Sequence, residues 1–239
     1  MADAARTVDL RGSTIPYDVR HSTRAERSRI TVDAGGVTVV VPEGAVVDPE
    51  HILQNHTDWV LARHEELEAY RDRIPDRHFE AGASFPYLGE PHEVVVETRP
   101  YSVVDDGTLR LAANHVAETS VKRALETLYR RLARERFESL AEQYATEMGV
   151  EYGRIEVRNQ RTKWGSCSTS GTISLNWRLL LGPPEVSEYV VIHELAHRRE
   201  MNHSEAFWAL VADHDPAYER HRTWLSEHAT RLVFDPDDL

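Results

Sequence analysis

Apolar and polar residues alternate along much of the first part of the chain, which predicts β-strands separated by turns. The alternation runs through residues 14–41 and returns in residues 82–98 and 109–111. Between these stretches, residues 49–73 carry apolar side chains at helical spacing, so one helix interrupts the strands. The pattern therefore predicts a β-rich N-terminal part with one helix, residues 1–113.

In the second part of the chain, residues 114–239, the apolar spacing lengthens to three and four, which predicts helices. One long amphipathic helix is expected over residues 115–148, and Gly149 is a suitable end for it. Two short strands follow, around residues 155–157 and 173–175, and we expect them to form a small antiparallel sheet. The fold class is therefore α+β, with the N-terminal part packed on a helical domain.

A largely apolar helix near residue 190 contains the pentad His193-Glu194-Leu195-Ala196-His197, an H-E-x-x-H motif. Residues four apart lie on one face of a helix, so His193 and His197 can bind one metal ion. Glu194 then lies where a carboxylate can take a proton from a metal-activated water. Two surface histidines on an amphipathic helix are the alternative, which the apolar lead-in over residues 186–192 disfavours.

His203 is the candidate for a third metal ligand, because a turn at residues 201–202 would return the chain toward the first two histidines. Asn202 or Ser204 would then cap the next helix. Three protein ligands and one open position are typical of a catalytic zinc site. Metzincins share this histidine spacing, but Glu200 stands where they have glycine, so the chain does not fit that clan.

Other possible ligands are less well placed. Asp213 follows His203 in the same predicted helix at a distance of about 15 Å along its axis. His214 and Asp215 lie at a similar distance, so they cannot serve the same ion. Cys167, the only cysteine, is expected to pack as a small apolar side chain.

A basic cluster precedes the motif helix, where Arg158, Arg161 and Lys163 lie beside Trp164. Positive side chains next to an aromatic ring could bind a polyphosphate and stack a nucleotide base. The alternative is a local ion-pair cluster with Trp164 in the core. A strand at residues 172–176 could instead align an extended substrate through backbone hydrogen bonds.

The composition narrows the choice of partners. The 40 acidic residues outnumber the 28 basic ones, which gives a formal charge of -12 and argues against general nucleic-acid or anionic-membrane binding. Lys122 and Lys163 are the only lysines, a balance expected of a protein kept soluble in high salt. One cysteine, no signal-like N-terminus and no long apolar run favour the cytoplasm. The oligomeric state does not follow from the sequence.

Four segments in this order resemble the YgjP-like metallopeptidases, which are related to the SprT-like and WLM proteases. They are GASFPYLGEP, RTKWGSCS, LNWRLL and YVVIHELAHRREMNHSEAFW. The resemblance implies a zincin-like fold for residues 114–239, with zinc held by His193, His197 and His203 and with Glu194 as the catalytic residue. Other matching signature positions are Arg161, Trp164, Gly165, Ser166, Cys167 and Asn176. Lys163 departs from the arginine that is more usual there, which loses a bidentate fork.

The leading hypothesis is a zinc-dependent hydrolase, a metallopeptidase in which Glu194 is the general base; another divalent ion could replace zinc. The expected substrate-binding residues are Arg161, Lys163, Trp164 and Asn176. A first alternative is a metal-dependent nucleoside triphosphate pyrophosphohydrolase that uses Arg158 together with Arg161 and Lys163. A second is a non-enzymatic interaction protein stabilised by its metal.

Overall fold

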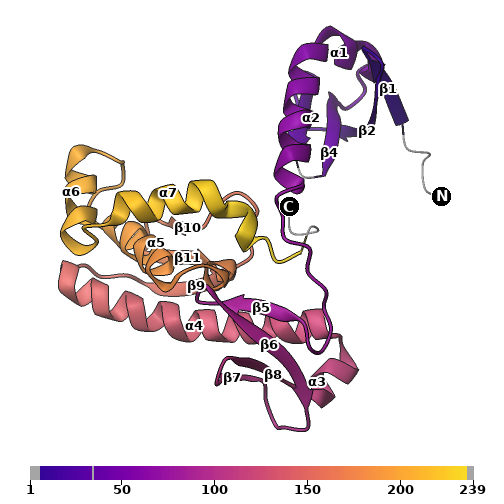
Figure 1. Ribbon diagram of the computed structural model, residues 1–239. Helices are drawn as coiled ribbons and strands as arrows, with labels where there is room; N and C mark the ends of the chain where they lie inside the picture. The colour runs from indigo at the N-terminus through magenta and orange to yellow at the C-terminus, as the bar shows by residue number, and fades with distance from the viewer. Residues whose placement is uncertain (1–5, 34, 236–239) are drawn as a thin grey trace. The chain divides into compact units, whose positions relative to one another are not determined.

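The computed structural model describes residues 6–33 and 35–235 and has the α+β architecture expected from the sequence (Figure 1). The chain divides into two compact units between Ile74 and Pro75, not after residue 113 as predicted. Residues 75–113 carry a sheet whose buried face belongs to the core of the second unit, which explains the earlier boundary.

The first unit is a four-stranded sheet with two helices. Its strands have the order β1-β2-β4-β3, and β2 pairs in parallel with β4. The single helix predicted here is two helices, because His56 leaves the helical region between them. The elements are β1 Arg6–Leu10, β2 Ser13–Ser22, β3 Arg29–Asp33, β4 Gly36–Pro42, α1 Pro49–Asn55 and α2 Thr57–Arg71.

A second four-stranded sheet opens the second unit, with the order β5-β6-β8-β7. Its strands are β5 Ser84–Tyr87, β6 Glu90–Glu97, β7 Val103–Asp105 and β8 Thr108–Ala112. Phe85, Val94, Leu109 and Leu111 are almost fully buried and join the same hydrophobic core as the helices that follow. This sheet is therefore the part of the N-terminal region that packs on the helical domain.

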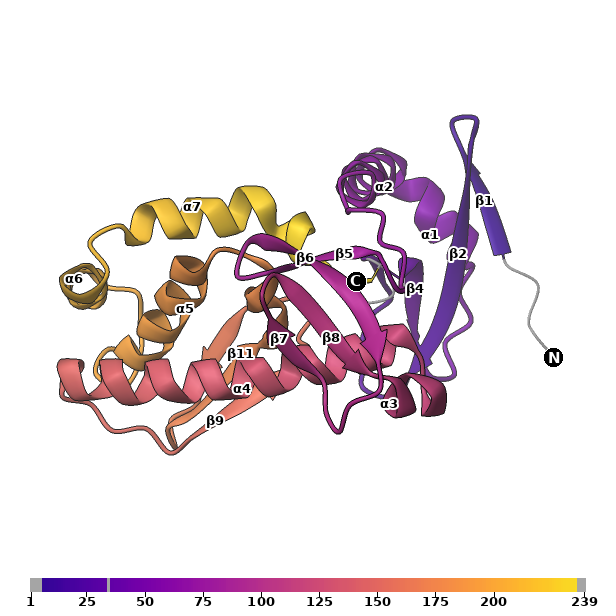
Figure 2. The same cartoon turned by 60° about the horizontal axis from the view of Figure 1, so that its bottom comes forward.

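The long helix predicted for residues 115–148 is interrupted near its start. A short helix, α3 Ala113–Glu118, ends at Thr119, and α4 Val121–Met148 begins after it. Ser120 caps α4 by accepting a hydrogen bond from the Arg123 amide, and Gly149 ends it in the left-handed conformation. In Figure 2, α4 runs beneath α5, and its buried stripe provides one wall of the core.

Three strands form the sheet next to the motif helix: β9 Arg154–Arg158, β10 Gly165–Cys167 and β11 Thr172–Asn176. Their order is β10-β11-β9, with β10 antiparallel and β9 parallel to β11. The predicted antiparallel pair is thus a mixed sheet, because residues 159–164 cross over before β10 and β11 form the hairpin. Consequently β11 is paired on both sides, and β10 is an edge.

The remaining elements surround the motif. The 3-10 helix η1 Trp177–Leu181 leads into α5 Pro184–Ala196, which is buried over most of its length. Then come α6 Glu205–His214, α7 Tyr218–His228 and the 3-10 helix η2 Ala229–Leu232. Helix α5 packs on α4, α6, α7 and β10, so its apolar residues are enclosed by the rest of the unit.

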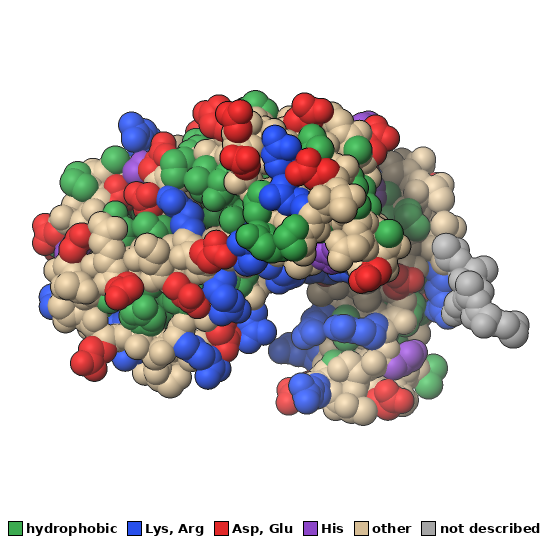
Figure 3. Space-filling model, turned by 90° about the horizontal axis from the view of Figure 1, so that it is seen from below, with side chains coloured by type: hydrophobic (Ala, Val, Ile, Leu, Met, Phe, Trp, Pro, Cys, Tyr) green, Lys and Arg blue, Asp and Glu red, His purple; other side chains and the backbone are tan. Residues whose placement is uncertain are grey.

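Two general properties bear on the choice of partners. On the face drawn in Figure 3, acidic side chains are spread among basic ones and do not form one continuous patch. Within residues 6–33 and 35–235, no helix is long and apolar enough to cross a bilayer.

Candidate metal centre and active-site cleft

Helix α5 presents His193 and His197 one turn apart. The prolines at its start fix a backbone conformation that suits a first helical turn, and an apolar surface holds the helix in the core. The centroids of the two imidazole rings lie 5.1 Å apart. The helix ends at Ala196, with His197 as the capping residue, so the second imidazole is at the point where the chain turns away.

His203 reaches this pair because the chain turns back directly after α5. Ser204 caps α6 by accepting a hydrogen bond from the Phe207 amide, one of the two caps expected from the sequence. The Nε2 atoms of His203 and His193 lie 3.1 Å apart. One ligand atom from each of the three histidines lies within 4.8 Å of the others, and the Phe207 ring packs against all three imidazoles.

The three imidazoles have the chemistry that a zinc ion requires. Two nitrogens bound to one tetrahedral zinc lie about 3.3 Å apart, close to the separation of the Nε2 atoms of His193 and His203. His197 donates from Nδ1 to the Glu200 carbonyl at 3.0 Å, which leaves its Nε2 lone pair available. Burial, together with the neighbouring histidines, lowers the pKa of His193 to about 3, and burial lowers that of His197. Both rings are therefore neutral at pH 7, as metal ligands must be.

The competing ligands considered from the sequence are engaged elsewhere. His214 donates to the Leu210 carbonyl, and Asp215 pairs with His221 at 2.8 Å between Oδ2 and Nδ1. Throughout the described part of the chain, no other group of three or more potential metal-binding side chains comes together. Cys167 is half-buried and is not a member of the histidine group.

Glu194 follows His193 on α5, lines the same cleft and is only 5% exposed. Burial raises the pKa of its carboxyl to about 7, and the Lys163 ammonium partly opposes this rise. A carboxyl with this pKa can both accept and release a proton near neutral pH. The backbone of Gly165 in β10 lies against it, since a Cβ atom there would be 2.5 Å from Oε1 of Glu194.

A cleft of about 380 Å³ opens over Glu194 and His193. One wall is the segment that enters β10, and the other is formed by α5 and α7. Its lining residues are Thr162, Lys163, Trp164, Gly165, Tyr189, Val190, His193, Glu194, Arg222, Leu225 and Ser226. The cleft is open to solvent and is large enough for a few residues of a peptide.

The residues expected to bind substrate have different environments. Lys163 and Trp164 line the cleft. Arg161 is exposed but is not among the lining residues. Arg158 forms an ion pair with Glu156 at 2.5 Å between Nη2 and Oε2, so this part of the basic cluster is the local ion pair considered as the alternative.

Asn176 does not fit the predicted contact with substrate. Its side chain is fully buried, and Nδ2 donates to the Gln160 carbonyl at 2.8 Å and to the Lys163 carbonyl at 3.4 Å. Its Oδ1 accepts from the backbone and side chain of Arg178. A side chain enclosed in this way cannot reach the cleft, so Asn176 holds the preceding loop in place instead.

The cleft also contains residues that were not predicted from the sequence, among them Arg222 and Tyr189. Arg222 reaches it from α7, and Tyr189 lies one turn before His193 on α5. The i, i+4 spacing of Tyr189 and His193 was a usable signal for the second residue. Arg222 lies 29 positions after His193, and no local pattern connects the two.

Comparison with known proteins gives a family and two solved structures. A family model described as YgjP-like, metallopeptidase domain, matches residues 26–228. The metallopeptidase zymogen abylysin of Pyrococcus abyssi is 29% identical over 40% of this chain and 94% of its own, with a TM-score of 0.36. The zymogen jannalysin of Methanocaldococcus jannaschii is 18% identical over 39% and 96%, also with a TM-score of 0.36. No curated protein matches the chain.

Proposed function

The chain belongs to the YgjP-like metallopeptidase family, whose members are metal-dependent hydrolases, and we propose that it is a zinc-dependent peptidase. His193, His197 and His203 hold the ion in this proposal, and Glu194 is the general base. The observation that carries it is the convergence of three imidazoles on α5 and the turn that follows it, with His193 and the buried Glu194 carboxyl lining a cleft. The three-histidine set leaves the open coordination position that a catalytic zinc needs.

The residues of the chain divide the chemistry among themselves. Zinc, when bound, would activate a water molecule and polarise the scissile carbonyl. Glu194 takes the proton of the attacking water and later delivers it to the leaving amine. The apolar residues packed around α5 keep bulk water away from the buried side of the Glu194 carboxyl, which strengthens the electrostatic interactions of this group. His197 keeps its ring orientation through the hydrogen bond to the Glu200 carbonyl.

Strand β10 is the segment that aligns the substrate. An extended peptide can add to the edge of a sheet through backbone hydrogen bonds, and β10 is the edge nearest the cleft. Residues 172–176 were expected to align the substrate, but β11 already pairs with strands on both sides, so we assign this role to β10. Gly165 begins β10 directly beside Glu194, so a peptide paired there would have its backbone near the proposed base.

The two alternatives have less support. A nucleotide-binding cluster would need Arg158, whose guanidinium is taken by Glu156. A structural zinc site normally has four protein ligands, and within the described residues no fourth side chain joins the three histidines.

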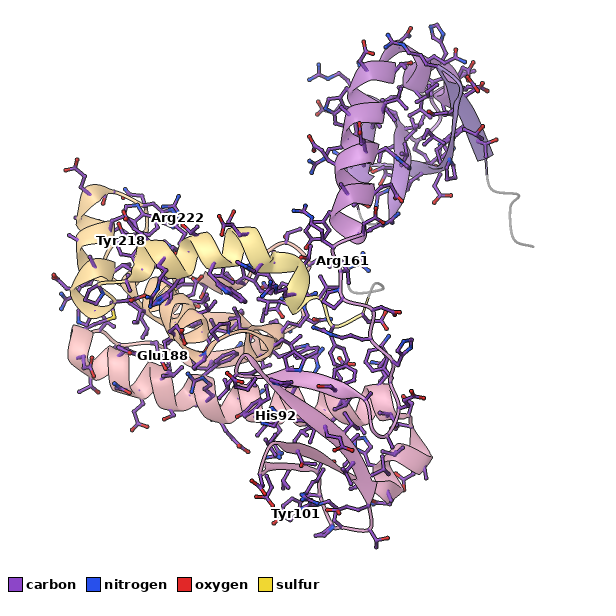
Figure 4. All side chains as sticks on the ribbon, viewed as in Figure 1. His92, Tyr101, Arg161, Glu188, Tyr218 and Arg222 are labelled. Atoms are coloured by element: carbon purple, nitrogen blue, oxygen red, sulfur yellow. The ribbon has the colours of Figure 1, made fainter. Side chains whose placement is uncertain are left out.

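The test combines metal analysis with a peptide-cleavage screen of the full chain. The wild type should bind one zinc per chain and cleave peptides, with activity lost on chelation and restored by zinc. Glu194→Gln should keep the zinc and lose about 10²–10⁴-fold in kcat, the usual contribution of a general base. Glu188→Gln is the matched control on the same helix, because Glu188 pairs with Arg136 outside the cleft lining (Figure 4). A Glu194→Gln variant with wild-type kcat would refute the assigned role.

A further inference from the structure

Two cationic side chains line the cleft from its opposite walls. Lys163 precedes β10, and Arg222 lies in the middle of α7. Both groups act electrostatically on residues of the site. Lys163 lowers the pKa of Glu194 and so opposes the larger rise that burial causes. Arg222 lowers the pKa of His193 and so adds to the larger decrease that burial causes. Glu194 is the one carboxyl in the lining. The proposed ion would add two further positive charges to this cleft.

Neither cation has a carboxylate partner within 4.0 Å in the described part of the chain. Three other arginines of this unit do have such partners, since Arg154 and Arg158 share Glu156 and Arg136 pairs with Glu188. In a chain with a formal charge of -12, carboxylates are abundant as neighbours. A cleft with two unpaired cations is therefore a local reversal of the protein's charge.

An aromatic stack restrains Arg222. Its guanidinium carbon lies 5.1 Å from the centroid of the Trp208 ring. Trp208 in turn stacks on Tyr218, with centroids 5.2 Å apart, and on His203, with centroids 5.6 Å apart. Tyr218 and Arg222 lie one turn apart on α7 (Figure 4). A guanidinium whose face packs on a ring keeps its edge N–H groups for a planar anion.

We propose that this cleft selects peptides that carry a carboxylate within one or two residues of the scissile bond, and that Lys163 and Arg222 bind it. The inference rests on the proposed peptidase function and adds a substrate class to it. The carboxylate can belong to an aspartate or glutamate side chain or to the free C-terminus, because both present the same planar anion. Arg222 suits a bidentate contact, whereas Lys163 acts as a point charge on the other wall.

The experiment measures kcat/KM of the zinc-loaded full chain on matched peptides. One set differs only by Asp, Asn or Lys next to the cleaved bond, and each peptide is made with a free and with an amidated C-terminus. A charge-assisted contact predicts that Asp exceeds Asn by about 10- to 100-fold, with Lys lower still. If the terminal carboxylate is the bound group, the free peptides exceed the amidated ones by a similar factor, whatever the side chain.

Variants assign the preference to the two cations. Lys163→Met combined with Arg222→Gln should reduce the Asp-to-Asn ratio, or the free-to-amidated ratio, to about one. Arg222→Glu should shift the preference toward the Lys peptide. Arg220→Gln is the matched control, because Arg220 is also exposed on α7 but lies outside the cleft lining.

The results separate this inference from the proposed function. If peptides are cleaved with equal kcat/KM whatever their charge, the substrate class is wrong and the peptidase function stands. A preference for anionic peptides that survives the double variant would also overturn the assignment to Lys163 and Arg222. If the zinc-loaded protein cleaves none of the peptides, with either a free or an amidated C-terminus, both proposals fail.

Discussion

Replacing Gly165 with alanine should disable the proposed general base without disturbing the metal ligands. A Cβ atom at this position would lie 2.5 Å from Oε1, 2.8 Å from Cγ and 2.9 Å from Cδ of Glu194. The 2.5 Å approach falls 0.9 Å short of the 3.4 Å at which ordinary van der Waals contact begins. Because Cγ is also too close, rotation of the carboxylate alone cannot relieve the contact, and the Glu194 side chain must move.

The size of this movement sets the expected loss of rate. A displacement of about 1 Å in a catalytic group can cost about 100-fold, which corresponds to about 2.7 kcal/mol in the activation free energy. We therefore expect Gly165→Ala to lower kcat about 100-fold on a verified substrate. Zinc content should stay at the wild-type level, because the three atoms nearest the added methyl group all belong to Glu194.

A stability measurement tests the contact independently of substrate. Overpacking by one methyl group costs about 1–3 kcal/mol of unfolding free energy in a closely packed site. In a Glu194→Ala background the three contacting atoms are gone, so Gly165→Ala should cost almost nothing there. Urea denaturation of the metal-free proteins gives both values, and Ser166→Ala controls for a change in β10. Equal costs in the two backgrounds, or an unchanged kcat, would show that Gly165 does not confine Glu194.

Three further substitutions test the ligand set and the loop that forms the cleft wall. His203→Ala should weaken zinc binding by more than about 100-fold in a competition titration. His214→Ala should keep the affinity and lose only the hydrogen bond to Leu210, about 1 kcal/mol of stability; the opposite pattern would mean that the third ligand is misassigned. Asn176→Ala should cost about 1–3 kcal/mol in urea denaturation, because it leaves the buried Arg178 amide without its acceptor and the Gln160 carbonyl with only the Arg178 guanidinium as a donor. A change below 0.5 kcal/mol, measured with ~0.2 kcal/mol precision, would contradict that bracing role.

Features that depend on neighbouring residues could be predicted from the sequence. The long helix followed from apolar residues at spacings of three and four, and Leu125 and Leu128 are buried as that pattern requires. The i, i+4 spacing of His193 and His197 is enough to predict that both lie on one face of α5. Ser204 could be predicted to cap α6, because a short hydroxyl side chain directly before an apolar helix can accept a hydrogen bond from a free amide of the first turn.

Features that depend on distant pairing could not be predicted in the same way. Strand β10 has only three residues, Gly165–Cys167, and shows no alternation of its own. Its pairing with β11, and the parallel pairing of β11 with β9, are set by the crossover of residues 159–164. The predicted position of the domain boundary was wrong for a similar reason. Alternation showed that residues 82–111 form strands but carried no information about which core their apolar face joins.

The polar residues of the segment before α5 show why residue type alone misassigns a role. Asn176 and Lys163 both looked like substrate contacts, yet Asn176 binds the loop carbonyls and Lys163 lines the cleft. The two roles are complementary, because an amide buried under the loop fixes the backbone from which Lys163 and Trp164 extend. Gly165, the next residue, leaves room for Glu194. The buried Asn176, the absence of a side chain at Gly165 and the Lys163 ammonium therefore act together to shape the space around the proposed base.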